Sequence, residues 1–289
     1  MSGSRFDQPK KFTHFDTHHW ADWVELCCVE DLDGTTSRKE MEKRFHRSVE
    51  GEKSVTLMEV DLDLESVDEE DEDIVVDDRT TEKVADWFDH LHGRSVNFGD
   101  AYPFAFSSDG RSLTLKEQLS DTHRLYLAML LMANLHYFQE LQHELSADFE
   151  RLSECALRRL LQSGAEVHVF GKGPAASSRY SGIAWDRIRK LAVDLRAKLL
   201  GKEEDFPPQS SGDGGLDLVA WHDLKDGRDN IPVALAQCGC TADDWSKKML
   251  EASPASLGGN LSTGHPWATY YFMPLDLTDE RDGQMQWQE

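Results

Sequence analysis

The chain has 289 residues, of which 39% are hydrophobic and 29% charged, and its formal charge at pH 7 is −23. It is long enough for one large domain or two modest ones. So negative a chain argues against a free-standing, non-specific binder of DNA or of anionic membranes, because such proteins gain affinity by neutralising phosphate groups. The acidity is uneven, however: residues 1–149 carry 15 basic and 33 acidic side chains (net −18), and residues 150–289 carry 16 and 21 (net −5). The argument against DNA therefore applies mainly to the first half.

Cysteine content and apolar runs indicate the compartment. The five cysteines are odd in number and none shows the paired C-x-x-C spacing of a zinc site, which fits a reducing environment. The first residues lack the apolar core of a secretory signal. The most apolar stretch, residues 125–138, is shorter than the roughly 20 residues that cross a bilayer. We expect a soluble, cytoplasmic protein with no structural zinc and no membrane contact.

The first half reads as a mostly helical domain over residues 1–145. Residues 14–31 predict a short helix running into a strand. Residues 37–50 predict a helix, because Ser37 can cap it with Glu40 as the partner three residues later. Residues 59–78, which include the acidic segment Asp61–Asp78, alternate apolar and acidic residues and then become a run of acids. We interpret them as an edge strand followed by a solvated or mobile loop, with a partner-docking or DNA-mimic role as the alternative for the run.

Two further helices and a strand complete this domain. Residues 81–92 place apolar residues at i, i+3, i+4 and i+7 from Val84, with Gly93 as a stop signal. Residues 102–106 read as a short strand. Residues 115–145 predict one long helix whose middle is apolar nearly all round, as in a buried core helix. We expect this acidic domain to regulate the second half or to dock it to a partner.

The second half, residues 146–289, predicts a mixed α/β domain. Its apolar residues recur with helical spacing in some segments and alternate as in strands in others. Helices are predicted over residues 147–161, 186–200 and 243–252, and strands over residues 165–170, 216–221, 233–238 and 269–277.

The segment from Gly212 to Cys238 carries the candidate chemistry. A tight turn, Gly-Asp-Gly-Gly, leads into a strand in which Asp217 is flanked by apolar residues. A carboxylate in such a place is costly unless it is paired or binds a metal. The next strand carries Gln237 near its end, so a hairpin would bring Asp217 and Gln237 close together at one end of a sheet. The alternative is that Asp217 caps a turn and Gln237 satisfies backbone groups.

Three separated elements resemble a known family. Gly-Asp-Gly-Gly-Leu-Asp-Leu-Val-Ala (212–220), Val-Ala-Leu-Ala-Gln-Cys (233–238) and Phe149-Glu150 on the preceding helix resemble the core of the PD-(D/E)xK nuclease superfamily, in its Mrr-like restriction endonuclease branch. The resemblance covers residues 146–277. It implies a restriction-endonuclease-like mixed sheet flanked by helices, and a metal-dependent endonuclease acting on double-stranded DNA. Such proteins commonly act in restriction or anti-phage defence beside an ATPase or sensor subunit, which would be the partner here.

The resemblance also implies a metal site. Hydrolysis of a phosphodiester needs a cation that activates water and stabilises charge on the phosphate, and Mg²⁺ (or Mn²⁺) with oxygen ligands is the expected cofactor. By the resemblance Asp217 is the principal ligand, the Cys238 carbonyl offers a second oxygen, and Glu150 positions a metal-bound water, with Glu154 as the alternative. Gln237 stands where many relatives have a second carboxylate.

The sequence departs from the family pattern at one position. Two residues after Gln237 the family has a lysine that orients the attacking water, and this chain has Gly239. The lysine could come from a neighbouring element, and Lys172, Lys247 and Lys248 are the candidates. If none of them reaches the site, the protein is a catalytically silent nuclease-fold subunit that binds DNA or a partner protein.

A basic helix is the candidate DNA-binding surface. Phosphate contacts require positive charges and impose little sequence preference. An ordinary solvated helix face is the alternative, because Asp186 and Asp194 interrupt the basic residues. The candidate residues are Arg187, Arg189, Lys190, Arg196 and Lys198, together with Lys172 and Arg179 on the preceding loop.

Overall fold

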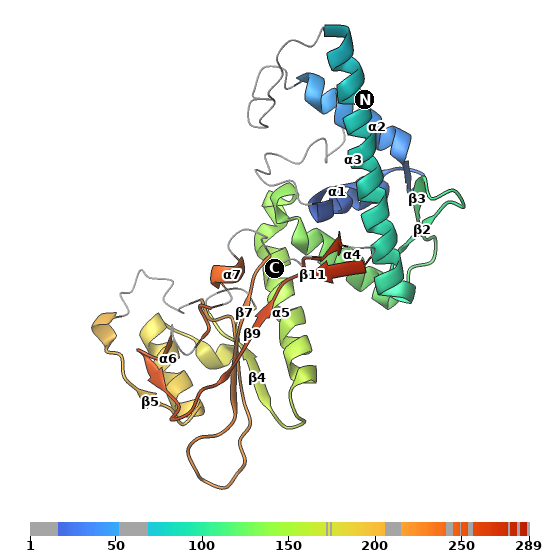
Figure 1. The fold of residues 1–289 in the computed structure, drawn as a ribbon. Coiled ribbons are helices and arrows are strands. Elements are labelled where there is room, and N and C mark those ends of the chain that lie inside the picture. The colour runs from blue at the N-terminus through green and yellow to red at the C-terminus, as the bar shows by residue number, and fades with distance from the viewer. Residues whose placement is uncertain are drawn as a thin grey trace. The chain divides into compact units, whose positions relative to one another are not determined.

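The computed structural model describes residues 17–51, 69–171, 173, 175–205, 215–240, 245–248, 250–253, 257–276, 278–281 and 284–287. The chain divides into two compact units (Figure 1). Unit 1 comprises Met1–Leu130 and Asp276–Glu289, and unit 2 comprises Leu131–Leu275. The expected boundary between residues 145 and 146 falls inside helix α5, Gln142–Leu160, which lies wholly in unit 2.

Unit 1 combines helices with a small antiparallel sheet. The sheet has the strand order β1-β3-β2, and strands β10 and β11 form an antiparallel pair near the end of the chain. Strand β10 packs beside α1 and α3, which is how the last residues join this unit. The elements are α1 (Thr17–Glu30), β1 (Thr35–Ser37), α2 (Arg38–Gly51), α3 (Glu69–Phe98), a 3₁₀ turn η1 (Gly99–Ala101), β2 (Phe104–Phe106), β3 (Ser112–Leu115), α4 (Asp121–Ala133), β10 (Thr278–Arg281) and β11 (Gln284–Trp287).

The N-terminal helices partly follow the sequence pattern. The capped helix is confirmed as α2, and the Glu40 amide donates to Ser37 Oγ at 3.3 Å. The helix predicted over residues 81–92 is confirmed within α3, but Gly93 does not stop it. Residues 69–73 of the acidic run form the first turns of α3, so the predicted loop is wrong there, because acidic side chains suit the positive end of a helix dipole. Residues 59–68 lie outside the described residues.

Two predicted elements of unit 1 take a different form. Residues 17–30 are helical throughout as α1, without the expected change into a strand. The single helix predicted over residues 115–145 is wrong: it separates into β3, α4, the 3₁₀ turns η2 (Leu135–Tyr137) and η3 (Gln139–Leu141), and α5. The break follows from the non-helical backbone of Asn134, with φ −119° and ψ 39°. Helix α4 is also not buried all round, since Leu125 is 47% exposed.

Aromatic packing between α1 and α3 forms much of the core of unit 1. Trp20 of α1 stacks on Trp87 of α3 with ring centroids 4.6 Å apart, and Trp23 meets the same ring edge-on. The apolar face predicted for residues 81–92 of α3 is confirmed, because Val84, Trp87 and Leu91 are all buried. Stacked aromatic pairs add to the free energy gained from burying their area.

Unit 2 is built on a four-stranded mixed sheet with the order β4-β6-β7-β9. Strands β4, β6 and β7 are antiparallel neighbours, and β9 runs parallel to β7. Three of the four predicted strands are therefore confirmed, the fourth is confirmed in part because β9 ends at Phe272 and residues 273–276 are not strand, and the domain is mixed α/β. The elements are α5, β4 (Glu166–Val169), the 3₁₀ turn η4 (Ser178–Tyr180), α6 (Ala184–Asp194), β5 (Lys198–Leu199), the 3₁₀ turn η5 (Glu203–Asp205), β6 (Leu218–Trp221), β7 (Val233–Cys238), α7 (Trp245–Lys248), β8 (Leu261–Ser262) and β9 (Ala268–Phe272).

The two faces of this sheet bury different clusters. Side chains alternate between faces along a strand, and Leu218 and Ala236 pack with Leu157 of α5, while Val219 and Leu235 pack with α6. Helix α6 ends at Asp194, six residues before the predicted end. The predicted extension to residue 200 is wrong because the chain leaves the helix at Arg196, whose φ is +51°. In the described part of the chain, no helix has the length and apolar character needed to cross a bilayer.

Candidate active site

Asp217 lies where two central strands of unit 2 meet. Strands β6 and β7 are antiparallel, so the start of β6 faces the end of β7. The Asp217 amide donates to the Ala236 carbonyl at 3.0 Å. The Cys238 amide in turn donates to Asp217 Oδ2 at 2.7 Å. These two bonds flank Gln237, so the hairpin brings the two sequence candidates Asp217 and Gln237 to the same end of the sheet.

The Gln237 side chain holds one unsatisfied polar atom. The residue is 6% exposed, and its Nε2 donates to Glu251 Oε2 at 2.7 Å. This bond fixes the orientation of the amide, because a carboxylate accepts the NH₂ group and not the oxygen. The Oε1 atom is buried and has no hydrogen-bond partner among the described residues. Burying an amide oxygen without a hydrogen-bond donor costs free energy. Such an oxygen is suited to bind a cation or a donor group of a ligand.

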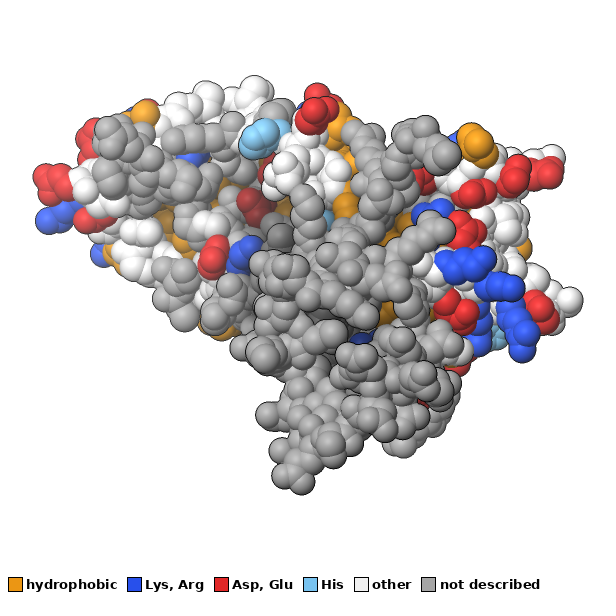
Figure 2. Space-filling model, turned by 90° about the horizontal axis from the view of Figure 1, so that it is seen from above, with side chains coloured by type: hydrophobic (Ala, Val, Ile, Leu, Met, Phe, Trp, Pro, Cys, Tyr) orange, Lys and Arg blue, Asp and Glu red, His pale blue; other side chains and the backbone are white. Residues whose placement is uncertain are grey.

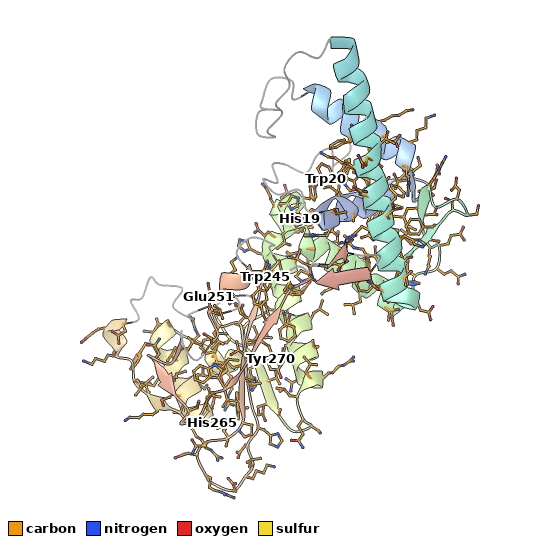
Figure 3. All side chains as sticks on the ribbon, viewed as in Figure 1. His19, Trp20, Trp245, Glu251, His265 and Tyr270 are labelled. Carbon is orange, nitrogen blue, oxygen red and sulfur yellow. The ribbon has the colours of Figure 1, made fainter. Side chains whose placement is uncertain are left out.

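Glu251 is a site residue that the sequence reasoning missed. It follows α7 and lies near Trp245 in the chain (Figure 3). Its carboxylate occupies the space where a Cβ on Gly215 would stand, and Gly215 has a φ of +72°. The glycine is thus needed both for its backbone conformation and for the approach of Glu251. Gln237 was the signal in the sequence for Glu251. Its amide can donate a hydrogen bond to a nearby carboxylate, whereas a carboxylate at position 237 would repel that group.

Tyr271 of β9 is the second residue that was missed. It is the register partner of Gln237 in the parallel pair β7–β9. Its hydroxyl stands where a Cβ on Gly239 would lie, with the ring Cζ at 2.8 Å from that position. Burial, with nearby thiol and carboxylate groups, raises the pKa of the Tyr271 phenol to about 12. The absent side chain at position 239 therefore makes room for a phenol that is neutral near pH 7.

Two thiols and the α5 carboxylate lie on the other side of Asp217. Burial raises the pKa of the Cys238 thiol well above its usual value, and the negative charges of Asp217 and Glu150 add to the effect. The pKa of Cys240 rises to about 12, first through burial and then through the same two carboxylates. Both thiols are therefore protonated near pH 7 and are poor nucleophiles. Glu150 faces the loop after β4 as well, since a Cβ on Gly173 would lie 3.5 Å from Glu150 Oε2.

Glu154, the alternative to Glu150, and the candidate lysines lie in different surroundings. Glu154 pairs with Arg158 at 2.9 Å, so it is engaged on the helix surface while Glu150 approaches the thiols. Lys248 is half-buried and lies near Cys240, where its positive charge opposes the rise in the pKa of that thiol. Lys172 and the side chain of Lys247 lie outside the described residues.

The oxygen donors of this site fit the chemistry of Mg²⁺. No three His, Cys, Asp or Glu side chains within the described ranges are grouped as a preformed metal cage. Mg²⁺ keeps several waters and is usually bound through one or two carboxylates together with substrate phosphate, so it does not need such a cage. The Asp217 carboxylate and the unsatisfied Gln237 Oε1, which has no donor in the described structure, could hold it, with Glu150 or Glu251 orienting its waters. By the resemblance, Cys238 would contribute only through its main-chain carbonyl.

The expectation that Arg187 forms part of a DNA-binding surface is wrong. Arg187 is 1% exposed. Its Nη1 donates to the Gly182 carbonyl at 3.1 Å, and its guanidinium lies 5.9 Å from the Phe170 ring centroid. The reason is its position in α6, on the same helical face as the buried residues Ile188 and Leu191. The arginine stabilises the interior of unit 2.

The other candidate basic residues fall into two groups. Arg179 forms a two-bond ion pair with Asp194, and Arg196 binds Asp223 at 2.7 Å, so these two are engaged within unit 2. On the face drawn in Figure 2, Asp and Glu side chains lie among the Lys and Arg side chains wherever the latter gather. The exposed candidates are Arg189, Lys190 and Lys198, together with the ion-paired Arg179.

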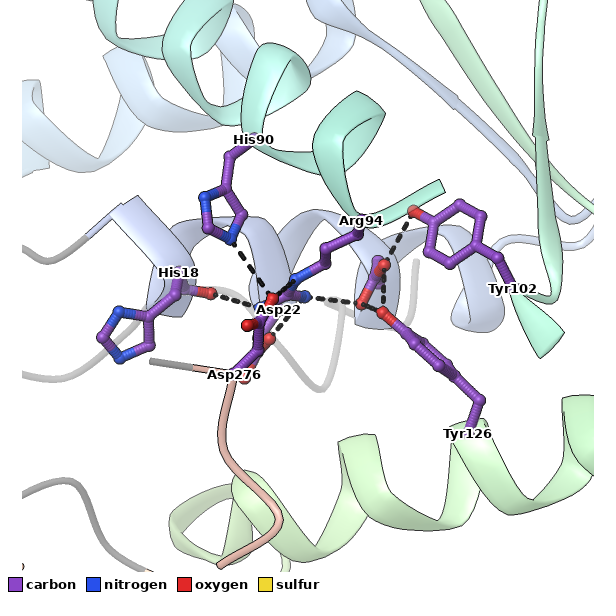
Figure 4. A network of polar contacts seen from close by, with 8 residues as sticks. His18, Asp22, His90, Arg94, Tyr102, Tyr126 and Asp276 are labelled. Atoms are coloured by element: carbon purple, nitrogen blue, oxygen red, sulfur yellow. Dashed lines mark hydrogen bonds and ion pairs between the residues drawn. The ribbon is translucent and has the colours of Figure 1, made fainter. Parts of the chain in front are cut away.

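A second polar cluster is buried in unit 1 (Figure 4). Arg94, which is 2% exposed, pairs with Asp22 at 2.7 Å, with Glu25 at 2.9 Å and with Asp276 at 2.9 Å. One guanidinium is therefore shared by these three carboxyl groups. The hydroxyl of Tyr102 also donates to Glu25 Oε1 at 2.8 Å.

The electrostatics of this cluster centre on Glu25. Burial raises the pKa of Glu25 from 4.5 to about 7, the nearby Asp22 adds to the rise, and Arg94 opposes it. Tyr126 donates to both carboxylate oxygens, at 2.8 and 3.1 Å. A raised pKa is the expected result when several carboxyl groups share one cation. Since every polar group of Glu25 is bonded within the unit, the cluster is well explained as a structural network.

Comparisons with protein-family models, with curated proteins and with solved structures found no match to this chain.

Proposed function

We propose that unit 2 is a metal-dependent DNA endonuclease with Asp217 at the centre of its active site. One observation carries the proposal: a carboxylate and a buried amide oxygen that has no partner within the described residues meet at the ends of two adjacent central strands. Asp217 is held there by the Cys238 amide at 2.7 Å, and Gln237 by Glu251 at 2.7 Å. Residues fixed in this way are preorganised for a ligand that both oxygens can bind.

The topology of unit 2 supports the proposal. Helix α5 precedes three antiparallel strands, and after α7 the last strand, β9, returns parallel to β7. The three elements on which the resemblance rests, a helix and two strands, correspond to α5, β6 and β7 in this order. Glu150 lies on α5, Asp217 directly precedes β6 and Gln237 is the penultimate residue of β7.

The chain's own residues would act in defined ways during hydrolysis. When bound, Mg²⁺ or Mn²⁺ supplies the charge that polarises the phosphate and the attacking water. Asp217 and Gln237 hold the oxygen positions at the strand ends, and Glu150 orients a water and accepts its proton. Lys248 is the described lysine near these groups and is the candidate for the role that Gly239 cannot fill.

We also propose the setting that the resemblance implies. The protein would be the effector of a restriction or anti-phage defence system, brought to double-stranded DNA by an ATPase or sensor subunit. The strongly acidic residues 1–149, with a net charge of −18, support a partner-controlled enzyme, because they lower the intrinsic affinity of the chain for DNA.

A plasmid assay tests the proposal. The purified protein, alone and with the products of its genomic neighbours, is incubated with supercoiled plasmid and Mg²⁺ or Mn²⁺. We expect nicking or linearisation that EDTA abolishes and that Asp217→Asn abolishes. Asp226→Asn, which neutralises an exposed carboxylate in the turn between β6 and β7, is the matched control and should stay active. Cleavage by the Asp217→Asn protein would refute the assigned site.

A catalytically silent nuclease-fold subunit is the second candidate. Two observations favour it: Gly239 replaces the lysine of the family pattern, and Arg179, Arg187 and Arg196 each bond to another residue of unit 2. In the same assay, a protein that cleaves under no condition but binds DNA or a partner protein would establish this function instead.

A further inference from the structure

The hydroxyl of Tyr271 is a buried donor without an assigned role. Its oxygen is buried and finds no hydrogen-bond partner within the described part of the chain. It also takes up the space that any side chain at position 239 would need, because its oxygen and its ring Cζ both lie against that position. A buried hydroxyl normally has a partner, so an unsatisfied one beside a candidate site indicates a ligand.

A second unsatisfied atom stands in the same row of the sheet. Tyr271 and Gln237 are register partners on β9 and β7, so their side chains leave the same face of the sheet. Gln237 is 6% exposed, and its Oε1 has no donor among the residues described. The row thus offers one unsatisfied acceptor and one unsatisfied donor. An acceptor can hold a cation or a water, whereas a neutral donor can hold an anion.

Resting on the function proposed above, we propose that the Tyr271 hydroxyl, which fills the space left open by Gly239, donates a hydrogen bond to a non-bridging oxygen of the DNA phosphate under attack. In the reaction, the water oxygen forms a bond to phosphorus and its proton passes to Glu150 or to solvent. The bond from phosphorus to the sugar oxygen breaks, and the leaving oxygen keeps the electron pair and takes up a proton from a solvent water. Tyr271 keeps its proton throughout. The hydrogen bond from its hydroxyl becomes stronger as negative charge builds up on the phosphate oxygens.

The surroundings of Tyr271 favour this role over that of a cation ligand. The carboxylates Asp217 and Glu251 lie near the phenol, so the site already has oxygen acceptors for a cation. A phosphate needs hydrogen-bond donors. The Tyr271 hydroxyl is a neutral donor, and no described group accepts a hydrogen bond from it. A neutral donor also avoids competing with the cation for the carboxylates.

Single-turnover cleavage of a plasmid by the full chain, with its partner if one is needed, tests the proposal. We expect Tyr271→Phe to lower the rate about tenfold to a hundredfold, which is the usual cost of losing one hydrogen bond to a charged transition state. Mn²⁺ affinity, the thermal unfolding midpoint and the affinity for uncleaved duplex in Ca²⁺ should stay within a small factor of the wild-type values. Tyr270→Phe is the matched control, because residue 270 is next on the same strand and packs on the opposite face; it should cleave as the wild type does.

A second variant reaches the same hydroxyl from the other side. Gly239→Ala places a Cβ where the phenol stands, so it should displace the hydroxyl and slow cleavage by a similar factor. In a Tyr271→Phe background the same change should slow cleavage much less, because the donor is already absent. Independent, additive losses would overturn the proposal, since they would mean that Gly239 acts through packing alone.

The outcomes separate this inference from the proposed function. If the wild type cleaves, Asp217→Asn does not, and Tyr271→Phe cleaves at the wild-type rate, the role of Tyr271 is refuted while the nuclease stands. If the wild type does not cleave under any condition, the nuclease and the role of Tyr271 are refuted together. If Tyr271→Phe loses Mn²⁺ binding in step with its activity, the hydroxyl is a cation ligand and the phosphate contact is refuted.

Discussion

Glu25→Gln tests the buried cluster of unit 1 most directly. The cluster places the carboxyl groups of Asp22, Glu25 and Asp276 around the guanidinium of Arg94. Burial raises the pKa of Glu25 from 4.5 to about 7. The folded protein therefore retains a proton on Glu25 at pH values where the unfolded chain has already released it. Its contribution to stability is fully present below pH 4.5 and is lost as the pH rises towards 7.

The size of this effect follows from the pKa change. A rise from 4.5 to about 7, at about 1.4 kcal/mol per pKa unit, corresponds to about 3 kcal/mol of stability lost between pH 5 and pH 8. Glutamine is neutral at every pH and can bond Tyr102 and Tyr126 through its amide. Arg94 keeps its two remaining carboxylate partners in this variant. We expect Glu25→Gln to be more stable than the wild type at pH 8, and its stability to depend less on pH.

Urea unfolding at pH 5 and pH 8 measures the difference. Hydrogen–deuterium exchange of peptides from α1 and α3 assigns the unfolding free energy to unit 1. Other titrating groups contribute equally to both proteins, so the difference between the two pH profiles isolates Glu25. Glu82→Gln, at an exposed position of α3, is the control and should follow the wild-type profile. Parallel profiles for the wild type and Glu25→Gln would refute the reasoning.

Three further outcomes are expected. Burial lowers the pKa of His18 to about 3 from 6.5, so wild-type stability should fall as the pH drops from 6.5 towards 3, and in acid urea titrations His18→Gln should show a shallower fall. Arg94→Met leaves three carboxyl groups without their cation and should destabilise unit 1 by roughly 3–5 kcal/mol in urea unfolding at pH 7. Gly215→Ala and Gly227→Ala both place alanine at a φ of +72°, which costs roughly 1–2 kcal/mol each. Thermal unfolding should show the larger loss for Gly215→Ala, since only there does the new Cβ meet Glu251; equal losses would contradict the assigned contact.

The sequence predicted the parts of unit 2 that depend on local order. Alternating apolar residues located the strands, because residues that alternate faces leave a pattern with a period of two. The proximity of Asp217 to the end of β7 followed from the hairpin, in which neighbouring strands pair antiparallel. Arg187 could have been recognised as buried, because it shares a helical face with Ile188 and Leu191.

Tertiary placement was beyond the sequence pattern. Glu251 and Tyr271 reach the site from later in the chain, in the turn after α7 and on β9, and neither has a local signal of its own. Gly239 read as a missing lysine, whereas the structure shows a glycine whose open space the Tyr271 phenol occupies. The last strands also join unit 1, which no local pattern indicates, because their contacts are with helices more than a hundred residues earlier.

The candidate site is itself rich in negative charge. Asp217, Glu150 and Glu251 surround the strand ends, and Lys248 is the described cation near Cys240. A DNA phosphate approaching these carboxylates without a cation would be repelled, since like charges at short range cost free energy. On the proposed function, a divalent cation is therefore needed to bind the substrate phosphate as well as to activate water. On the same proposed function, the overall charge of −23 would make DNA binding depend on the metal and on a partner.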